Sequence, residues 1–261
     1  MRLFFATALL AIAGCNSPDK TENASMPGAY KMVSQNFKSD KIDTTNTSIQ
    51  QLKIYTDDYM MYAGFSPSDS SGTFGIGTYS ATKDTVTENV IYSASDTSKN
   101  ETPAIFNLVI TKTPKGFKQF IPEIKMGDQK FSLTEEYDAA GTATKSPLDG
   151  AWKLTKSYSI MGKDSFPETK TQFKIYGSGY FIFGQTFSDS ANKSHTAMGY
   201  GKFVMTGTTK SKESVLVSSF YQVRGQDVDI DIEMNGTDEY KQTYSTNDGY
   251  KGVEIYQRMK K

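Results

Sequence analysis

Short runs of alternating apolar and polar residues make up most of the chain from residue 28 onward, and turn-forming residues separate them at intervals of about eight to twelve positions. Alternation with a period of two is typical of strands that bury one face. In the first half, this pattern predicts strands over residues 28–35, 50–56, 59–65, 72–82, 86–93, 104–112, 116–121 and 130–137. No stretch of helical period competes with these runs, so the chain is predicted to be all-β.

The second half repeats the motifs of the first half in the same order, displaced by about 120 residues. The matched pairs are 28–32 (GAYKM) with 150–154 (GAWKL), 51–55 (QLKIY) with 172–176 (QFKIY), 75–79 (GIGTY) with 199–203 (GYGKF), and 88–93 (ENVIYS) with 213–218 (ESVLVS). This period is far too long for a solenoid, and each copy has the size of an independent domain. We therefore expect two tandem domains, at residues 27–141 and 147–261.

The predicted strands in each copy form consecutive hairpins. In the second copy, Asn235-Gly236 lies between predicted strands 228–233 and 238–244, and an Asn-Gly pair is a strong signal for a tight antiparallel hairpin. An open meander would leave exposed edges, whereas closure removes them. We therefore predict two tandem antiparallel up-and-down β-barrels, each with about eight strands. A β-sandwich remains the structural alternative.

The N-terminus has the layout of a secretory signal, because Arg2 comes first, an apolar run follows from residue 3 to 13, and small residues precede Cys15. The apolar run is too short to cross a bilayer as a helix. Residues 12–15 (IAGC) closely resemble the cleavage box of bacterial lipoproteins. That resemblance implies that residues 1–15 hold the signal peptide and that Cys15 carries the lipid, with acyl chains such as palmitate as a stable anchor. An ordinary signal followed by an incidental cysteine is the alternative.

A polar segment, residues 16–26, follows the cysteine and is expected to be a flexible linker between the lipid and the first domain. Asn16 stands where an aspartate would indicate retention in the inner membrane of well-studied lipoproteins. The resemblance therefore implies an outer-membrane lipoprotein in the cell envelope of a Gram-negative bacterium, facing either the periplasm or the surface. Cys15 is the only cysteine, so no disulfide is available and core packing must hold each copy together.

Charge and composition restrict the partners of the protein. The chain has 29 acidic and 29 basic residues with no basic block, which disfavours nucleic acid and strong attraction to a membrane surface. We therefore expect membrane contact through the lipid anchor only. Tyr and Phe number 16 each, and both favour pleated, half-buried surfaces, in agreement with the strand pattern.

The residues that most enzymes and metal sites need are scarce. His195 is the only histidine and lies in a polar stretch that is expected to form a solvated hairpin loop. Nucleophilic arrangements of serine or cysteine with histidine, and zinc sites, would need unusual substitutes. A barrel enzyme built from carboxylates and tyrosines would need paired acids in a pocket and a raised carboxylate pKa. We expect no enzyme activity, no metal and no cofactor.

One strand carries a regular row of acids. Residues 227–233 (DVDIDIE) alternate acidic and apolar side chains, so Asp227, Asp229, Asp231 and Glu233 share one strand face. This face is expected to be solvated. Calcium binding is the functional alternative, because clustered oxygens suit hard cations.

The interior of an eight-stranded barrel either is filled by its own side chains or holds one small ligand. The candidates to line an apolar pocket with hydroxyl handles are aromatic, namely Tyr59, Tyr62, Phe74, Tyr79, Tyr92, Phe106, Tyr180, Phe183, Tyr200, Phe203, Phe220 and Tyr221. Plain core packing is the alternative. Glu88 and Glu213 occupy matched positions in the two copies. Each is either an inward acid that orients a ligand head group or an outward residue that pairs with a lysine.

Both copies resemble the bacterial lipocalin-like domains, relatives of the lipocalin and fatty-acid-binding barrels. Residues 150–152 (GAW) have the Gly-x-Trp form that opens the first strand of lipocalins, and Arg258 lies on the last predicted strand. The resemblance implies that Arg258 stacks on Trp152 and closes the base of the second barrel, a structural contact worth about 0.5–2 kcal/mol. The first copy has Tyr30 instead of tryptophan and no arginine over 131–137, so its closure must differ.

These expectations favour a lipid-anchored envelope protein whose barrels bind a small hydrophobic or amphipathic molecule without covalent bonds. The alternative is a structural or interaction module with filled barrels that docks another envelope protein or a glycan. The two hypotheses differ in whether an internal cavity exists. The sequence names no protein partner and leaves the orientation of the two copies open.

Overall fold

The computed structural model describes residues 26–94, 103–126, 129–142, 144–245 and 249–261. The predicted signal peptide, Cys15 and the linker up to residue 25 lie outside the described residues. In the described part of the chain, no helix is long and apolar enough to cross a membrane.

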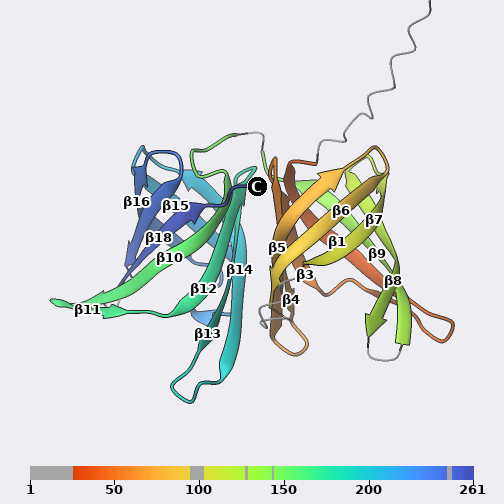
Figure 1. Ribbon diagram of the computed structural model, residues 1–261, viewed down its shortest axis with the longest axis horizontal. Coiled ribbons are helices and arrows are strands. Elements are labelled where there is room, and N and C mark those ends of the chain that lie inside the picture. The colour runs from red at the N-terminus through yellow and green to blue at the C-terminus, as the bar shows by residue number, and fades with distance from the viewer. Residues whose placement is uncertain (1–25, 95–102, 127–128, 143, 246–248) are drawn as a thin grey trace, which may run out of the picture.

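The first half folds into one antiparallel sheet that closes on itself (Figure 1). Its strands are β1 (Gly28–Lys38), β2 (Asp43–Asn46), β3 (Gln50–Tyr55), β4 (Tyr59–Ser66), β5 (Ser71–Ala81), β6 (Thr85–Ser93), β7 (Ala104–Lys112), β8 (Gly116–Met126) and β9 (Gln129–Ala140). Strands β1 and β3 to β9 follow one another around the barrel, and β1 pairs with β9 to close it. Strand β2 only extends β1 as a hairpin beyond the barrel wall.

The second half repeats this arrangement strand for strand. Its elements are β10 (Gly150–Met161), β11 (Asp164–Pro167), β12 (Lys170–Gly177), β13 (Tyr180–Ser188), β14 (Ser194–Met205), β15 (Lys210–Ser218), the short 3₁₀ helix η1 (Tyr221–Val223), β16 (Asp227–Asn235), β17 (Glu239–Ser245) and β18 (Lys251–Arg258). Strands β10 and β18 pair and close the barrel. The prediction of two tandem, closed, antiparallel eight-stranded barrels is confirmed. The sandwich alternative is wrong, because first and last strands pair in each half.

The two barrels lie side by side, with β3 to β5 of the first facing β12 to β14 of the second (Figure 1). In both of these groups of strands, apolar residues occupy both faces. On β3, for example, Leu52 and Ile54 are fully buried outside the barrel, whereas Lys53 and Tyr55 are buried inside it. The outward side chains of the two groups form one shared core, which we call the inter-barrel core.

Close contacts across the inter-barrel core depend on glycine. A Cβ on Gly184 of β13 would lie 2.4 Å from the ring of Phe74 on β5, so only a glycine leaves room for that ring. A Cβ on Gly72 would lie 2.9 Å from the side chain of Met198 in the same way. Sheets packed this closely behave as one rigid interior.

Candidate functional site

Each barrel holds a buried ion pair in its interior. In the first barrel, Lys53 Nζ lies 3.1 Å from Glu88 Oε1, and the Tyr55 hydroxyl donates to the same carboxylate. In the second, Lys174 Nζ lies 2.7 Å from Glu213 Oε1, and the Tyr176 hydroxyl donates to it at 2.8 Å. All four charged side chains are more than nine-tenths buried. Glu88 and Glu213 thus point into the barrels, as one alternative held, but each pairs with a lysine, which was expected of an outward residue.

A second carboxylate lies beside each ion pair, and a glutamine links the two. In the second barrel, Lys174 Nζ donates to Gln242 Oε1 at 3.2 Å, and Gln242 Nε2 donates to Glu254 Oε2 at 2.7 Å. The Tyr256 hydroxyl also donates to Glu254 Oε2, at 2.7 Å. The first barrel has the same links. Lys53 donates to Gln119, and Gln119 and the Tyr137 hydroxyl both donate to Glu135.

The tyrosines of these networks stay protonated donors. Burial raises the pKa of Tyr55, Tyr176 and Tyr256 well above its ordinary value, and the neighbouring glutamates raise it further. Buried charges cost desolvation energy unless hydrogen bonds satisfy them, so a network of this kind is tolerated only when its partners are in place. Its presence in both copies indicates that it orders the barrel interiors.

The two copies differ in the side chain that donates to the second carboxylate, which is Glu135 in the first barrel and Glu254 in the second. In the first barrel, the neutral Gln35 donates from Nε2 to Glu135 Oε1 at 2.7 Å. In the second, Lys170 Nζ occupies that role at 2.7 Å from Glu254 Oε1, and it also lies 3.1 Å from Glu168 Oε2. The second barrel therefore contains an additional charged group, which we call the triad, formed by Glu168, Lys170 and Glu254.

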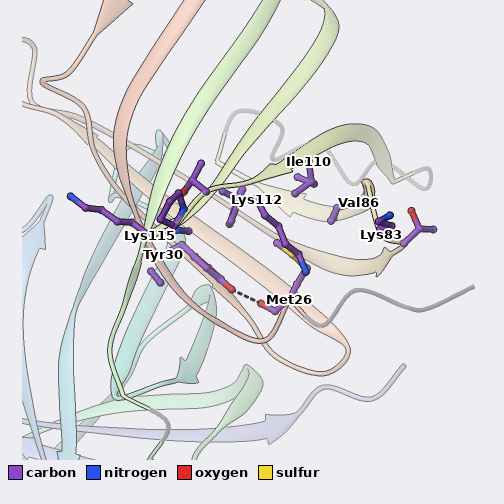
Figure 2. Close-up of a pocket in the computed structure, with 13 residues that line it drawn as sticks. Met26, Tyr30, Lys83, Val86, Ile110, Lys112 and Lys115 are labelled. Carbon is purple, nitrogen blue, oxygen red and sulfur yellow. Dashed lines mark hydrogen bonds between the residues drawn. The ribbon is translucent and has the colours of Figure 1, made fainter.

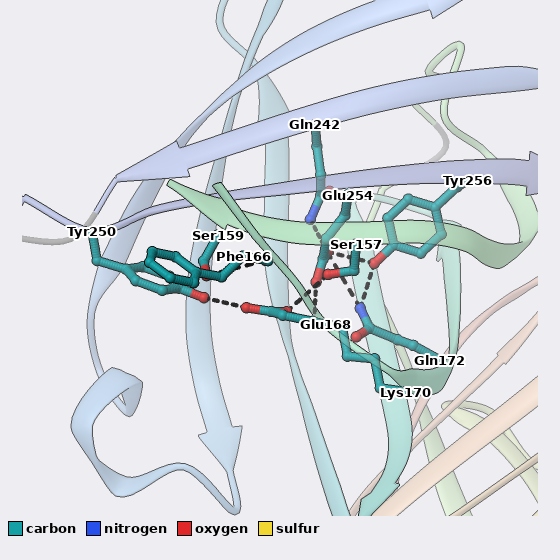
Figure 3. A network of polar contacts seen from close by, with 10 residues as sticks. All are labelled: Ser157, Ser159, Phe166, Glu168, Lys170, Gln172, Gln242, Tyr250, Glu254 and Tyr256. Carbon is teal, nitrogen blue, oxygen red and sulfur yellow. Dashed lines mark hydrogen bonds and ion pairs between the residues drawn. The ribbon is translucent and has the colours of Figure 1, made fainter. Parts of the chain in front are cut away.

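Hydroxyl groups complete the triad, as Figure 3 shows. Glu168 accepts hydrogen bonds from the Ser157 hydroxyl at 2.8 Å and the Tyr250 hydroxyl at 2.6 Å. Burial alone would raise the pKa of Glu168, but the hydrogen bond from Tyr250 and the charge of Lys170 outweigh it and lower that pKa. Burial likewise would lower the pKa of Lys170, but Glu254 and Glu168 outweigh it and raise that pKa. Glu168 and Lys170 are thus charged at neutral pH.

The triad and the Lys174–Glu213 pair form one wall of a large cavity in the second barrel. The cavity has a volume of about 1530 Å³. Its apolar lining consists mainly of Phe181, Phe183, Phe187, Phe220, Val228 and Tyr244. It extends to Ser188 and Tyr250 at one end of the barrel, which we call the mouth.

The opposite end of the second barrel, its base, is filled with side chains. The Arg258 guanidinium lies 4.0 Å from the centroid of the Trp152 ring. Trp152 Nε1 donates to the Leu148 carbonyl at 2.7 Å, and Arg258 Nη1 donates to the Asp149 carbonyl at 2.7 Å. Gly150 has a φ of +130°, and a Cβ there would lie 2.3 Å from Arg258 Nη1, so the glycine of the GAW motif is required by this close approach.

The first barrel is closed differently at the corresponding end. Tyr30 takes the place of tryptophan, lies edge-on to Phe117 at 4.9 Å between ring centroids, and donates from its hydroxyl to the Met26 carbonyl at 3.2 Å. A cavity of about 290 Å³ remains at this end, and Lys83, Lys112 and Lys115 are among the residues around it (Figure 2). The interior beyond it is packed mostly with aromatic and apolar side chains, namely Tyr55, Met60, Tyr79, Val86, Leu108, Ile110, Phe117 and Tyr137.

The candidate aromatic residues fall into four places. Phe183 and Phe220 line the large cavity with nearly parallel rings, 6.4 Å apart at an interplanar angle of 13°. The barrel interiors hold Tyr62, Tyr79 and Phe106 in the first copy and Phe203 in the second. The inter-barrel core holds Tyr59, Phe74, Tyr92, Tyr180 and Tyr200. Tyr221 is 74% exposed on η1.

The five aromatic residues of the inter-barrel core lie between the barrels and line neither of the two cavities described above. Alternation shows that two strand faces differ, but it does not show that the second face is covered by another barrel. Sequence reasoning also missed Glu168, Lys170 and Tyr250. Their signal was the departure of the second copy from the first, where the positions of Glu168 and Lys170 hold Thr47 and Ile49.

The remaining candidates lie at the surface. His195 is the second residue of β14 and not a loop residue as expected, and its Nε2 lies 2.8 Å from Asp189 Oδ2, with about 38% of the His195 side chain exposed. The acids of β16 are exposed, and lysines of the neighbouring strands pair with them. Among the described residues, no group of three or more His, Cys, Asp and Glu side chains is placed to hold a metal ion.

Comparison with known proteins gives little further information. No protein-family model and no curated protein matches the sequence. A solved structure, a protein of unknown function from the DUF3598 family of Nostoc punctiforme, aligns at 10% identity over 89% of this chain and 96% of that chain, with a TM-score of 0.26. A likeness this weak supports no argument about the site, so the function must be argued from the barrels themselves.

Proposed function

We propose that the second barrel binds a small amphipathic molecule, without covalent bonds, in its cavity of about 1530 Å³. This cavity is the observation that carries the proposal. Ligand pockets typically have volumes of about 300–1,000 Å³ and combine an apolar lining with a few polar groups. The cavity is larger than that range, and its aromatic walls and triad supply both kinds of lining. A lipid-sized ligand with one polar end fits this description.

The first barrel, in this proposal, is a filled partner that supports the second. Its interior holds a cluster of buried aromatic and apolar side chains, among them Tyr55, Phe117 and Tyr137. The hypothesis of a filled interaction module thus applies to the first copy and the hypothesis of ligand binding to the second. The lipocalin-like resemblance is in keeping with this division, because one barrel retains the Trp152–Arg258 contact at a closed base and an open interior above it.

Binding without catalysis is part of the same proposal. A general acid at neutral pH needs a carboxyl group with a raised pKa. The pKa of Glu168 in the cavity wall is lowered instead, by the Tyr250 hydroxyl and Lys170 acting against burial. This carboxylate is thus suited to hold a charge and not to donate a proton.

We also propose that the protein is an outer-membrane lipoprotein, with Cys15 modified by acyl chains such as palmitate. The support is the resemblance of residues 12–15 to a lipoprotein cleavage box. Expression in a Gram-negative host with a radioactive or alkyne-labelled palmitate should label the wild-type chain, and the label should be lost in Cys15→Ser. Fractionation of the envelope then tests the outer membrane. Labelling of the variant, or none in either chain, would refute this part.

The cavity proposal is tested by native mass spectrometry of the chain from Asn16 to Lys261 after secretion into a bacterial periplasm. We expect a stoichiometric small-molecule adduct in the wild type. Val228 lines the cavity, so Val228→Trp should remove the adduct by filling the space. Val204→Trp is the matched control, because Val204 is 56% exposed on the outer surface. An apo mass in every chain, also after incubation with lipid extracts, would reject ligand binding.

A further inference from the structure

We infer that the ligand of the second barrel is a cationic amphiphile, with an apolar body and a protonated amine as its polar end. This inference rests on the proposed function and names its ligand class. Three observations carry it, namely the charge of the cavity wall, two unpartnered polar atoms in that wall, and the pairing of the lysines.

The cavity wall is acidic although the chain as a whole is neutral. Three carboxylates and two ammonium groups line the cavity inside the barrel, whereas the whole chain has equal numbers of acidic and basic residues. The carboxylates are Glu168, Glu213 and Glu254, and the ammonium groups are Lys170 and Lys174, whereas the aspartates of β16 lie on the exposed face of that strand. A concave surface with low-dielectric walls focuses such a field. The local potential therefore attracts a cation and repels a carboxylate or a phosphate.

Two deeply buried polar atoms in the wall have no hydrogen-bond partner in the described part of the chain, Gln172 Oε1 and Ser211 Oγ. Gln172 is 4% exposed and Ser211 is 1% exposed. The amide orientation of Gln172 is set by its Nε2, which donates to the Tyr256 hydroxyl and to Glu254 Oε2 at 3.4 Å. Oε1 is thus left as an acceptor, and an ammonium group brings three donors and no acceptor.

The first copy has no hydroxyl group that corresponds to Ser211 Oγ. Ser211 lies two residues before Glu213 on β15, and the corresponding residue before Glu88 is Val86, which is buried in the packed interior. The hydroxyl is therefore present only in the copy that has the large cavity. A buried polar atom without a partner is rare in proteins, and a ligand is one of its explanations.

The lysines of the cavity are already paired. Lys170 Nζ lies 2.7 Å from Glu254 and 3.1 Å from Glu168, and Lys174 Nζ lies 2.7 Å from Glu213. An anionic head group would have to compete with these carboxylates. A cationic one keeps both ion pairs, and the rings of Phe183 and Phe220 also offer it aromatic faces.

The test uses the chain from Asn16 to Lys261 and three probes with the same twelve-carbon tail, dodecylamine, dodecanoate and dodecanol, each below its critical micelle concentration. Isothermal titration calorimetry at neutral pH should give one site for dodecylamine, with an affinity at least about tenfold higher than that for dodecanoate. Added salt should weaken the binding of the amine more than that of the alcohol, because salt screens the acidic wall.

Substitutions test whether the named residues cause the preference for dodecylamine. Ser211→Val, which introduces the residue of the first copy, should weaken dodecylamine several-fold and leave dodecanol unchanged. Glu168→Gln removes a carboxylate of the cavity wall and should lower the amine preference. Its matched control, Glu233→Gln, removes the same charge from an exposed position and should retain the preference.

The outcomes separate the two proposals. If dodecanoate or dodecanol binds as tightly as the amine, the head-group inference is wrong while the cavity function stands. If no probe binds to the wild type, both are wrong. A preference for the amine that survives in Ser211→Val and in Glu168→Gln would also overturn the inference, because the named atoms would not be its source.

Discussion

At the scale of single residues, the triad distinguishes the two copies. Lys170 and Glu168 replace Ile49 and Thr47 of the first copy, and they add an ion pair with Glu254 to an otherwise duplicated network. An exposed ion pair contributes little to stability, but the Lys170 side chain is only 10% exposed. We therefore expect the triad to contribute to the stability of the second barrel.

That contribution should depend on pH in a defined direction. The pKa of Glu168 is lowered from its ordinary value of 4.5, so its stabilisation is present above that value and is lost as the pH falls through the lowered one. Glu168→Gln should reduce the free energy of unfolding by about 1–2 kcal/mol at pH 7. The difference from wild type should shrink as the pH falls below 4.5 in urea denaturation.

A control for this variant is Glu233→Gln, because Glu233 is 69% exposed and pairs with Lys241 at the surface. Its cost should be below about 1 kcal/mol at pH 7 and at pH 3. An equal loss for Glu168→Gln at pH 3 and pH 7 would contradict the assigned role of its charge.

Single residues also show how much of the candidate site can be predicted from the sequence. The matched positions of Glu88 and Glu213 indicated a shared role, but only the register of the strands places both carboxylates inside. Glu168 lies just before β12, in a turn without periodicity, and its role depends on Ser157 and Tyr250 from distant parts of the sequence. Contacts of that kind do not follow from local patterns.

At the scale of elements, the repeated Gly-x-Gly motifs of β5 and β14 each lie opposite a β-bulge in the neighbouring strand. The register shifts between Ile76 and Gly77 past one extra residue of β6, Ile91, and between Tyr200 and Gly201 past one extra residue of β15, Leu216. A Cβ on Gly77 would lie 1.9 Å from the Asn89 carbonyl oxygen, and one on Gly201 would lie 2.0 Å from that of Ser214. The bulge therefore requires glycine.

The bulge explains how the aromatic candidates divide between two places. On β15, Val215 points into the barrel and Val217 into the inter-barrel core, at a spacing of two that reverses the alternation. The shift on β6 likewise places Tyr92 in the inter-barrel core, although Val86 lies in the barrel. The strands themselves, the Asn235-Gly236 hairpin and the duplication all follow from the sequence, because they depend on local pattern. Strand β2 does not, since its four residues (DTTN) are polar and mostly exposed.

A glycine substitution tests this role of the bulge. Gly201→Ala forces the β14 and β15 backbones apart and should destabilise the protein by about 1–3 kcal/mol, measured by thermal and urea denaturation. Gly207→Ala is the matched control, because a Cβ there meets nothing within 4 Å. Its stability should stay within about 0.5 kcal/mol of wild type. Equal effects of the two variants would show that the bulge does not need glycine.

At the scale of the whole molecule, the inter-barrel core joins the two barrels into one unit. Its buried residues come from both halves, so each barrel covers an apolar face of the other. Interfaces between domains usually allow relative motion unless they are large and apolar. We therefore expect the two barrels to unfold together in one transition.

Differential scanning calorimetry of the wild type should show this single transition. Ile182 is fully buried in the inter-barrel core, so Ile182→Asp should split the transition or lower its midpoint by many degrees. Ile105→Asp is the control, because Ile105 is 62% exposed on the first barrel, and it should leave the transition nearly unchanged. Two well-separated transitions in the wild type would show that the barrels are energetically independent.

The central claim is that one barrel of the pair is open to a ligand and the other is filled. Its most direct measurement is photo-crosslinking of the chain from Asn16 to Lys261 with a dodecylamine analogue that carries a diazirine in its tail, followed by peptide mapping. The account predicts that the label concentrates on peptides holding Phe181 to Phe187 and Phe220 to Val228, which line the cavity, and that excess dodecylamine suppresses it. Labelling centred on strands of the first barrel, or spread over the surface without competition, would contradict it.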